Sequence, residues 1–404
     1  MRGIAGLFAG LGFLMAGTGA AVAACPSPSG FPKWLRTVQA EAFEAGVTQG
    51  AWDAAEPYLE FDPGIVKRDR NQGVFSQSFL DFSGRMVTNA RIQRGAGLIK
   101  KNKALFQKIE KKFGVPAPIL VAFWGLETDF GGNIGDLPIL RSLATLAYDC
   151  RRPEKFRPQL IAALQLIDAG DIAVDDMRGA WAGEVGQTQF MPGDYLEKAI
   201  DFDGDGRRDL RTSMPDVLAS TANFMRLAGW KPGQPWLQEV IVPDDLPWEQ
   251  ADLAIRLPRS QWAAWGVEMA NGNSVTADDV PVSLLLPMGR KGPAFFAYAN
   301  FQTYIKWNES LVYSTSAAYF AARLSGAGPV RKGSAPPFGY KQIVELQKLL
   351  TQRGFDVGKI DGKLGAGTRK AVKKMQLTFG LPADSWPTAG LVKQLKSGGS
   401  TPDG

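Results

Sequence analysis

The chain has 404 residues, of which 45% are hydrophobic and 10% aromatic, and it carries 46 Lys and Arg against 40 Asp and Glu. It contains two Cys and no His. The absence of His excludes nucleophile systems that need an imidazole base and zinc sites with His ligands, and two Cys cannot form an all-Cys zinc site. Any acid–base chemistry must therefore use carboxylates, Lys, Tyr or Cys.

The first 24 residues are typical of an export signal, with one charge at Arg2, an apolar run from Ile4 to Met15, and small residues up to Ala24. We therefore expect an exported protein that is soluble or tethered at its N-terminus. Cys25 follows the small residues directly, so it is either the lipid-carrying Cys of an anchored lipoprotein or one half of a disulfide with Cys150. We favour the disulfide, because Val22 matches a lipoprotein signal poorly and lipidation would leave Cys150 unpaired.

Hydrophobic periodicity and Pro/Gly punctuation predict helices along most of the chain and loops with a few strands in its third quarter. The loop-rich stretch runs from Pro232 to Pro293 and includes one short helix. The helices are expected at Phe31–Ala45, Ala90–Phe113, Pro118–Leu126, Pro158–Gly170, Pro192–Ile200, Pro215–Ala228, Ser260–Gly266, Tyr304–Leu324, Tyr340–Arg353, Gly367–Gly380 and Pro387–Leu395.

The C-terminal part differs in composition from the rest. Residues 331–404 carry 13 Lys and Arg against 5 Asp and Glu, whereas residues 25–330 carry 32 against 35. Residues 327–339 are rich in Pro, Gly and Ser and predict a linker to a small domain over residues 340–396. Its positive charge suggests an acidic partner, although charge alone favours a solvated face.

Glu127 is the leading candidate for chemistry. The helix before it is apolar on every side, so the carboxyl is expected to be buried near the negative end of the helix dipole. Both effects raise a carboxyl pKa and would let it retain a proton near neutral pH, as a general acid requires. The periodicity equally allows a Glu that merely ends the helix at the surface.

Two further segments combine amides with aromatic rings, as carbohydrate sites do. The segment 179–192 carries Gln187, Gln189 and Phe190, and the segment 300–313 carries Trp307, Asn308 and Tyr313. The amides need hydrogen-bond partners, which either sugar hydroxyls or the backbone would supply. Ordinary helix packing explains the aromatic residues of the second segment as well.

Acidic residues alternate in the segment 201–216 in a pattern that matches most of an EF-hand calcium loop. Asp201, Asp203 and Asp205 take the first ligand positions, and the carbonyl of Arg207 takes the seventh. Thr212 stands where the bidentate Glu belongs, and Asp216 is a candidate for the missing carboxylate. Because so many acids would repel one another, we favour a structural Ca²⁺ site over a solvated acidic loop.

Together these segments resemble the lytic murein transglycosylases of the membrane-bound lytic transglycosylase B type, over most of residues 31–325. The residues after the linker resemble a small peptidoglycan-binding module, through Val344–Leu350, Asp361–Gly365 and Ala371–Gln376. The motifs that carry the first resemblance occur in a compatible order: Phe113–Pro116, Trp124–Gly131, Ser142–Leu146, Gly183–Pro192, Asp201–Gly206, Trp307–Asn308, Ser310 and Tyr313.

The resemblance implies a mainly α (α+β) protein, with a lysozyme-like catalytic core and extra helical and loop-rich parts over residues 25–326 and a three-helix peptidoglycan-binding domain. It implies cleavage of the MurNAc-β-1,4-GlcNAc bond without water, with Glu127 as acid and then base and no cofactor for the chemistry. It places Gln189, Phe190, Trp307, Asn308 and Tyr313 at the sugar. We expect peptidoglycan glycan strands and other cell-wall enzymes as partners, no nucleic acid, and a monomer.

Two other functions stay open at this point. A hydrolytic muramidase would use a second carboxylate, for which Asp129 and Glu184 are available. Glu184 stands where many members of the family have a small residue, and Trp307 and Phe224 stand where Tyr is expected. A cell-wall-binding scaffold without turnover would need only the C-terminal domain.

Overall fold

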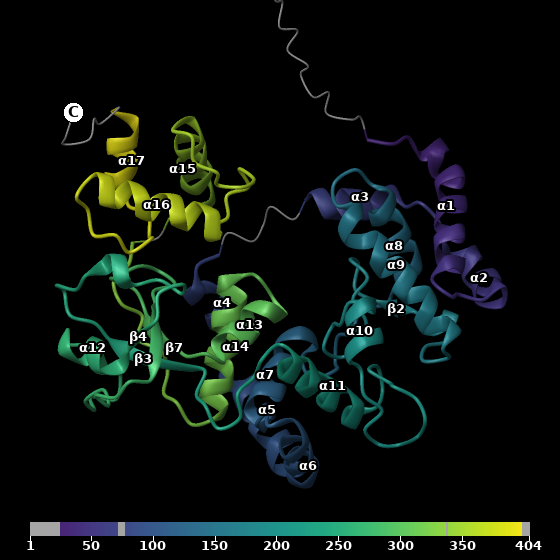
Figure 1. Ribbon diagram of the computed structural model, residues 1–404, viewed down its shortest axis with the longest axis horizontal. Coiled ribbons are helices and arrows are strands. Elements are labelled where there is room, and N and C mark those ends of the chain that lie inside the picture. The colour runs from purple at the N-terminus through teal and green to yellow at the C-terminus, as the bar shows by residue number, and fades with distance from the viewer. Residues whose placement is uncertain (1–24, 72–76, 337, 398–404) are drawn as a thin grey trace, which may run out of the picture.

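The computed structural model describes residues 25–71, 77–336 and 338–397, so the expected export signal lies outside the described residues. No helix in this described part is long and apolar enough to cross a membrane. Helices dominate residues 25–397 as described, and the strands found there form one small pair and one sheet (Figure 1). The fold is therefore mainly α with a β component, as the sequence predicts.

All the expected helices occur, in the expected order and with a few differences in bounds, and four further helices were not expected: Gln49–Ala55, Pro63–Arg70, Phe79–Met86 and Ile139–Tyr148. The helices of the first three quarters are α1 (Phe31–Glu44), α2 (Gln49–Ala55), α3 (Pro63–Arg70), α4 (Phe79–Met86), α5 (Asn89–Lys101), α6 (Lys103–Phe113), α7 (Ala117–Thr128), α8 (Ile139–Tyr148), α9 (Pro153–Asp168), α10 (Pro192–Lys198), α11 (Met214–Leu227) and α12 (Arg259–Ala264). The rest are α13 (Phe301–Trp307), α14 (Leu311–Leu324), α15 (Tyr340–Gln352), α16 (Ala366–Thr378) and α17 (Ala389–Lys396).

Two expected helices are each divided at an Asn, because an Asn side chain competes with the helix for backbone hydrogen bonds. Asn102 ends α5, and its Nδ2 donates to the carbonyl of Leu98 at 3.0 Å. Asn308 ends α13 in an extended conformation, and its Oδ1 accepts from the backbone N–H of Ser310. The third difference is α9, which begins at Pro153 and contains Pro158 inside it.

The strands form an antiparallel sheet in the order β4-β6-β7-β3-β5. Its register pairs Val240 with Ala294 and Leu284 with Phe296. Side chains on one face of this sheet, such as Val240 and Leu284, form a core of their own, whereas Leu285 and Phe295 on the other face belong to the main helical core. The sheet consists of β3 (Leu237–Ile241), β4 (Leu257–Pro258), β5 (Glu268–Met269), β6 (Pro281–Leu285) and β7 (Ala294–Ala297).

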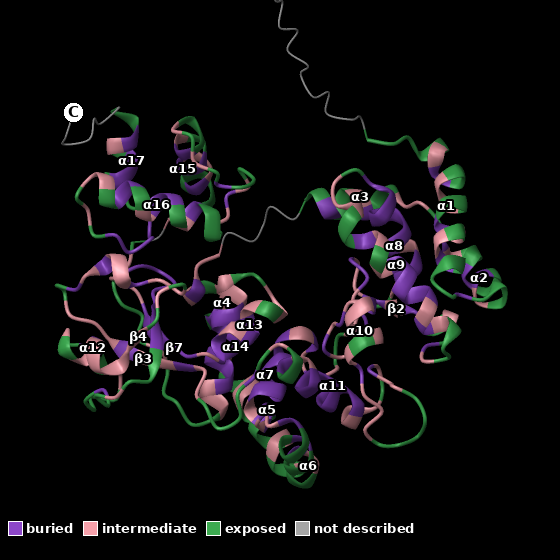
Figure 2. Cartoon of the chain, viewed as in Figure 1, coloured by how far each residue is buried: buried purple, intermediate pink, exposed green. Residues whose placement is uncertain are grey.

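The main helical core surrounds α7, whose residues are almost all buried (Figure 2). Helices α5, α11 and α14 pack against it. The strand β1 (Leu137–Pro138), which follows α7 in the chain, pairs with β2 (Arg178–Gly179). This pairing brings residues 179–190 to the C-terminal end of α7.

The N-terminal segment is joined to the chain near α8 by a disulfide between Cys25 and Cys150, with 5.0 Å between their Cα atoms. Tyr148 at the end of α8 donates from its hydroxyl to the carbonyl of Ser27 at 2.6 Å. Both contacts tie the first described residues to the helical core.

The C-terminal helices α15 to α17 form a third core. They lie beside the sheet rather than apart from it (Figure 1). Arg369 donates to the carbonyl oxygens of Leu286 and Pro287, and Lys373 pairs with Asp252 at 2.9 Å. The segment expected to be a linker is itself held, since the backbone N–H of Ser334 donates to the carbonyl of Lys291 at 2.7 Å.

Candidate active site

The helix α7 places Glu127 in its last turn. Pro116 and Pro118 start the helix, where a missing N–H has no cost, and the apolar residues that follow bury it. The chain then turns sharply, because Asp129 and Phe130 have left-handed backbone angles, φ 53° and 59°. Such angles are strained in residues other than Gly and are concentrated at functional sites. The last turn of α7 is thus fixed in an unusual conformation next to Glu127.

The Glu127 carboxyl receives two hydrogen bonds on the same oxygen. The indole Nε1 of Trp307 donates to Oε1 at 2.9 Å, and the hydroxyl of Tyr313 donates to the same Oε1. Both donors come from the segment around the break between α13 and α14. Oε2 receives no hydrogen bond from the residues that the structure describes, and the side chain is partly exposed. Oε2 is therefore the oxygen that can exchange a proton with a bound molecule.

Aromatic rings surround Trp307 and hold its indole against Glu127. The ring centroids of Phe123 and Phe224 lie 4.4 and 4.7 Å from that of Trp307. Phe190 lies 5.5 Å away on another side and is only 2% exposed. Phe190 therefore packs against Trp307 and exposes almost no surface to solvent, whereas the sequence predicted its ring at the sugar.

Burial raises the pKa of Glu127 from 4.5 to about 7. The hydrogen bonds from Tyr313 and Trp307 favour the anion and oppose this rise, while the negative charge of Glu184 adds to it. Burial and the charge of Glu127 raise the pKa of Tyr313 well above its usual value, so its hydroxyl keeps its proton. Glu127 is thus able both to donate and to accept a proton near neutral pH.

The other two carboxylates that the sequence offers have different surroundings. Asp129 forms ion pairs with Arg91 at 3.0 Å and Arg94 at 3.2 Å. Both arginines are on α5, so the carboxylate of Asp129 is held against that helix. Glu184 is half-buried, and burial raises its pKa. Asp129 is near Glu127 in the chain, and Glu184 is near it in space. Of these two carboxylates, Glu184 is the one without an ion pair within 4.0 Å among the described residues.

The structure brings Glu127, Trp307 and Tyr313 together, and it gives the two remaining predicted sugar residues backbone partners. Nε2 of Gln189 donates to the carbonyls of Gly186 and Ile134, and Oδ1 of Asn308 accepts from Ser310. Gln189 also has a left-handed φ of 54°. The side-chain oxygen Oε1 of Gln189 has no hydrogen bond within the described chain. It is the part of this side chain left for a ligand.

Gln187 is the residue whose structural importance sequence reasoning missed. Its Oε1 accepts from Nε1 of Trp124 at 2.7 Å, and its Nε2 donates to the carbonyl of Arg211 at 2.8 Å. These contacts join α7 to the segment 201–216. The sequence signal was an amide among apolar residues in a Gly-rich segment, which does not reveal which partners it has.

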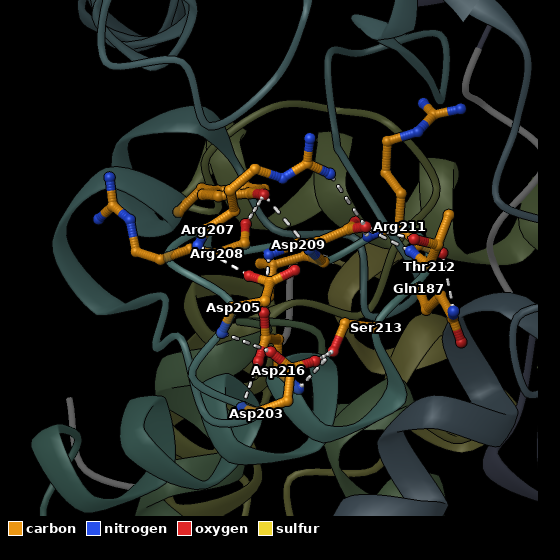
Figure 3. A network of polar contacts seen from close by, with 12 residues as sticks. Gln187, Asp203, Asp205, Arg207, Arg208, Asp209, Arg211, Thr212, Ser213 and Asp216 are labelled. Atoms are coloured by element: carbon orange, nitrogen blue, oxygen red, sulfur yellow. Dashed lines mark hydrogen bonds and ion pairs between the residues drawn. The ribbon is translucent and has the colours of Figure 1, made fainter.

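The acidic segment forms a loop over residues 201–213 that leads into α11, and Asp216 lies in the first turn of that helix (Figure 3). Carboxylate oxygens of Asp201, Asp203 and Asp205 lie within 4.8 Å of one another, and none of the three pairs with a Lys or Arg among the described residues. Asp216 is buried and stands apart from this cluster. Its oxygens accept from the backbone N–H groups of Phe202, Asp203 and Asp209, so it organises the loop.

Comparison with known proteins agrees with this arrangement. Residues 30–322 match a family model described as the transglycosylase SLT domain, and residues 340–395 match one described as a putative peptidoglycan binding domain. The chain therefore belongs to the transglycosylase SLT domain family and carries a C-terminal domain of the peptidoglycan-binding type. The lysozyme-like helical fold predicted from the sequence is confirmed.

Individual relatives are lytic transglycosylases by name. Membrane-bound lytic murein transglycosylase B of Escherichia coli is 28% identical over 240 residues, which cover 59% of this chain and 64% of that protein. The structure of SltB3 from Pseudomonas aeruginosa in complex with NAG-anhNAM-pentapeptide is 37% identical with a TM-score of 0.83, and the match covers 91% of this chain and 99% of that one. Soluble lytic transglycosylase SltB1 from Pseudomonas aeruginosa is 25% identical with a TM-score of 0.63, over 73% of this chain and all of the other.

Proposed function

We propose that this protein is a lytic transglycosylase that cleaves the MurNAc-β-1,4-GlcNAc bond of peptidoglycan without water and leaves 1,6-anhydromuramoyl ends. The observation that carries the proposal is Glu127, one partly exposed carboxyl with a pKa of about 7 whose Oε1 is occupied by two donors. Its relative SltB3 was solved with an anhydro-sugar peptide, which supports the same product here.

In the first step, the proton on Oε2 of Glu127 passes to the glycosidic oxygen as the C1–O bond breaks and positive charge develops at C1. In the second step, Oε2 accepts the proton of the muramic 6-hydroxyl as O6 bonds to C1 and closes the anhydro ring. The proton that Glu127 gives up is thus returned, and no water is consumed. The N–H of Trp307 and the hydroxyl of Tyr313 stabilise the carboxylate that exists between the two steps.

A hydrolytic muramidase is the competing function, and it needs a second carboxylate placed to activate water or to attack C1. Asp129 does not suit this role, because Arg91 and Arg94 hold its two oxygens. Glu184 is the remaining candidate, since its charge reaches Glu127. We assign Glu184 no part in the reaction, and its substitution tests that assignment.

The test compares Glu127→Gln with Glu184→Gln on purified sacculi. We expect Glu127→Gln to release no muropeptides while its circular dichroism stays native, because Gln can accept the two hydrogen bonds but cannot donate a catalytic proton. Glu184→Gln should retain activity within a few-fold. Activity in Glu127→Gln would contradict the proposal, and a wild-type protein that binds sacculi without cleaving them would favour the scaffold.

We propose further that the protein acts in the periplasm, with its C-terminal domain bound to peptidoglycan strands. A hollow of about 290 Å³ between α15 and α17 is lined by Phe338, Gln342, Glu345 and Lys393 among others, and offers both apolar and charged groups to a glycan or its peptide.

The disulfide of Cys25 fits an exported protein that is not lipidated. Palmitate labelling tests this, because a labelled product would exclude the disulfide. We expect a monomer, no nucleic-acid partner, and other cell-wall enzymes as partners.

For the acidic loop we propose a structural Ca²⁺ site. Three unpaired carboxylates within 4.8 Å of one another are a hard-oxygen donor set that fits this ion, and they would otherwise repel one another. Asp201, Asp203, Asp205 and the carbonyl of Arg207 would hold it, whereas Asp216 is not among the three clustered carboxylates and accepts from backbone N–H groups of the loop. The ion would neutralise the loop and take no part in the chemistry. Millimolar CaCl2 should raise the melting temperature above that in EDTA, and Asp203→Asn should remove the difference.

A further inference from the structure

Gln187 has all of its main hydrogen-bonding groups occupied by partners from two different parts of the fold. On one side, its Oε1 accepts from Nε1 of Trp124 at 2.7 Å, and its backbone carbonyl accepts from Oγ1 of Thr128 at 2.6 Å. On the other side, its backbone N–H donates to Leu210 and its Nε2 donates to Arg211, both at 2.8 Å. A single residue therefore fastens α7 to the acidic loop.

The partners on the helix side stand three residues before and one residue after Glu127. Oγ1 of Thr128 also accepts from the backbone N–H of Gly131 at 3.0 Å, which fixes the turn that ends the helix. Gly131 lies so close that an added Cβ would come within 2.4 Å of Oε1 of Gln187. Gln187 thus braces the strained turn that sets the direction of the Glu127 side chain.

The partners on the loop side are rigid in turn. Oδ1 of Asp209 accepts from the backbone N–H groups of Arg211 and Thr212, and the backbone N–H of Asp209 donates to the buried Asp216 (Figure 3). The carbonyl that receives Nε2 of Gln187 is therefore held by the folded loop. A continuous set of hydrogen bonds runs from Asp216 through Gln187 to Trp124 and Thr128, which lie before and after Glu127 on α7.

We propose that Gln187 is a positioning residue for Glu127: it holds the last turn of α7 against the folded acidic loop and so keeps the carboxyl aimed for proton transfer. This inference rests on the proposed function. An amide is needed because one end must accept from an indole N–H while the other donates to a carbonyl. Leu has similar volume and offers neither group, and Glu would set a second acceptor against the carbonyl of Arg211.

The experiment measures kcat, KM and the pH profile on soluble glycan strands for Gln187→Leu. The matched control is Gln165→Leu, which removes one side-chain hydrogen bond from α9 to the carbonyl of Ala45, away from Glu127. We expect Gln187→Leu to lower kcat by about 10- to 100-fold with KM within twofold, because misplacement of a catalytic group acts mainly on the chemical step. Its activity should also fall off at a lower pH than that of the wild type, since a loosened turn admits water to Glu127.

Gln165→Leu should keep the wild-type kcat and pH profile even where it lowers the melting temperature as much. A Gln187→Leu protein with kcat within threefold of the wild type and an unchanged pH profile would overturn the inference, as would losses that follow melting temperature alone in both variants. If Gln187→Leu does not fold, Thr128→Val removes one of the same contacts and should show the same two changes more weakly; its absence of effect would equally overturn the inference. An inactive wild type would instead overturn the proposed function.

Discussion

At Glu127 two donors share one carboxylate oxygen, so the chemistry is left to the other. The tryptophan N–H can only donate, and the pKa of Tyr313 is raised so far that its hydroxyl also stays a donor. Neither group can take the proton that Glu127 carries. In the proposed reaction the site therefore separates orientation of the carboxyl, at Oε1, from proton transfer, at Oε2.

Removal of the Tyr313 hydroxyl should change both the orientation of the Glu127 carboxyl and its pKa. Tyr313→Phe removes a donor that favours the anion, so the pKa of Glu127 should rise and the decline in kcat/KM at alkaline pH should move to higher pH. The rate at the optimum should fall by about tenfold or more, because the carboxyl is oriented less well. Tyr304→Phe is a matched control, since the buried hydroxyl of Tyr304 has no hydrogen-bond partner in the described chain. An unchanged pH profile in Tyr313→Phe would contradict the assignment.

The raised pKa of Glu127 also predicts a dependence of stability on pH. Because its folded-state pKa of about 7 lies above the value of 4.5 for an unperturbed Glu, the folded protein binds more protons between these limits. This carboxyl therefore contributes stability below pH 4.5 that is lost as the pH rises through 7. The free energy of unfolding of Glu127→Gln minus that of the wild type should therefore be about 2–3 kcal/mol larger at pH 9 than at pH 5. Urea denaturation at both pH values measures this, and an equal difference at both would contradict it.

At the scale of elements, the acidic loop is held by one buried carboxylate in addition to the hydrogen bonds of its exposed acids. Asp216 accepts from three backbone N–H groups of the loop. Asp216→Ala should therefore lower the free energy of unfolding by about 2–4 kcal/mol, measured in EDTA so that no cation contributes. Asp53→Ala, at an exposed position of α2, should change it by less than about 0.5 kcal/mol. Equal effects would show that the loop does not need Asp216.

Local pattern predicted most helices, and the limits of that prediction are visible in particular residues. The apolar run of α7 and its Pro residues mark its start, and the Gly pair after it marks its end. The breaks at Asn102 and Asn308 were missed because apolar periodicity continues across them, while the side-chain hydrogen bonds that end the helices depend on the three-dimensional backbone. The second break matters most, since it delivers both donors of Glu127.

The candidate site was predictable in its residue types but only partly in its contacts. Trp307 and Tyr313 were expected at the sugar, which stays a prediction, and the structure shows that their polar atoms donate to Glu127. The role of Gln187 depends on partners 63 and 24 residues away in the chain, and no local spacing contains such pairs. Long-range hydrogen bonding is thus the part of the site that a single sequence does not carry.

At the scale of the whole molecule, the C-terminal domain is docked on the sheet although its linker composition predicts a flexible tether. Arg369 inserts its guanidinium against the carbonyls of residues 286 and 287, and burial lowers its pKa to about 10, so it remains charged at neutral pH. Asp384 accepts from the backbone N–H of Arg290 at 3.0 Å, and Trp386 packs on Gly289. Charge composition could not reveal this interface, because the residues that form it are few and buried.

Arg369→Ala should release the domain from the sheet. Protease sensitivity of residues 327–339 and the radius of gyration in X-ray scattering should both increase, because two carbonyl partners and a buried cation are lost together. Lys370→Ala, an exposed neighbour on α16, should change neither quantity. A compact, protease-resistant Arg369→Ala protein would show that the docking does not depend on this side chain.

In the proposed mechanism, one carboxyl cleaves the glycan by acting first as acid and then as base, without water. Mass spectrometry of the muropeptides that the purified wild-type protein releases from sacculi distinguishes this mechanism from hydrolysis. We expect products that end in 1,6-anhydromuramic acid, formed by the wild type and absent with Glu127→Gln. Products with reducing muramic acid ends, heavier by one water, would contradict it.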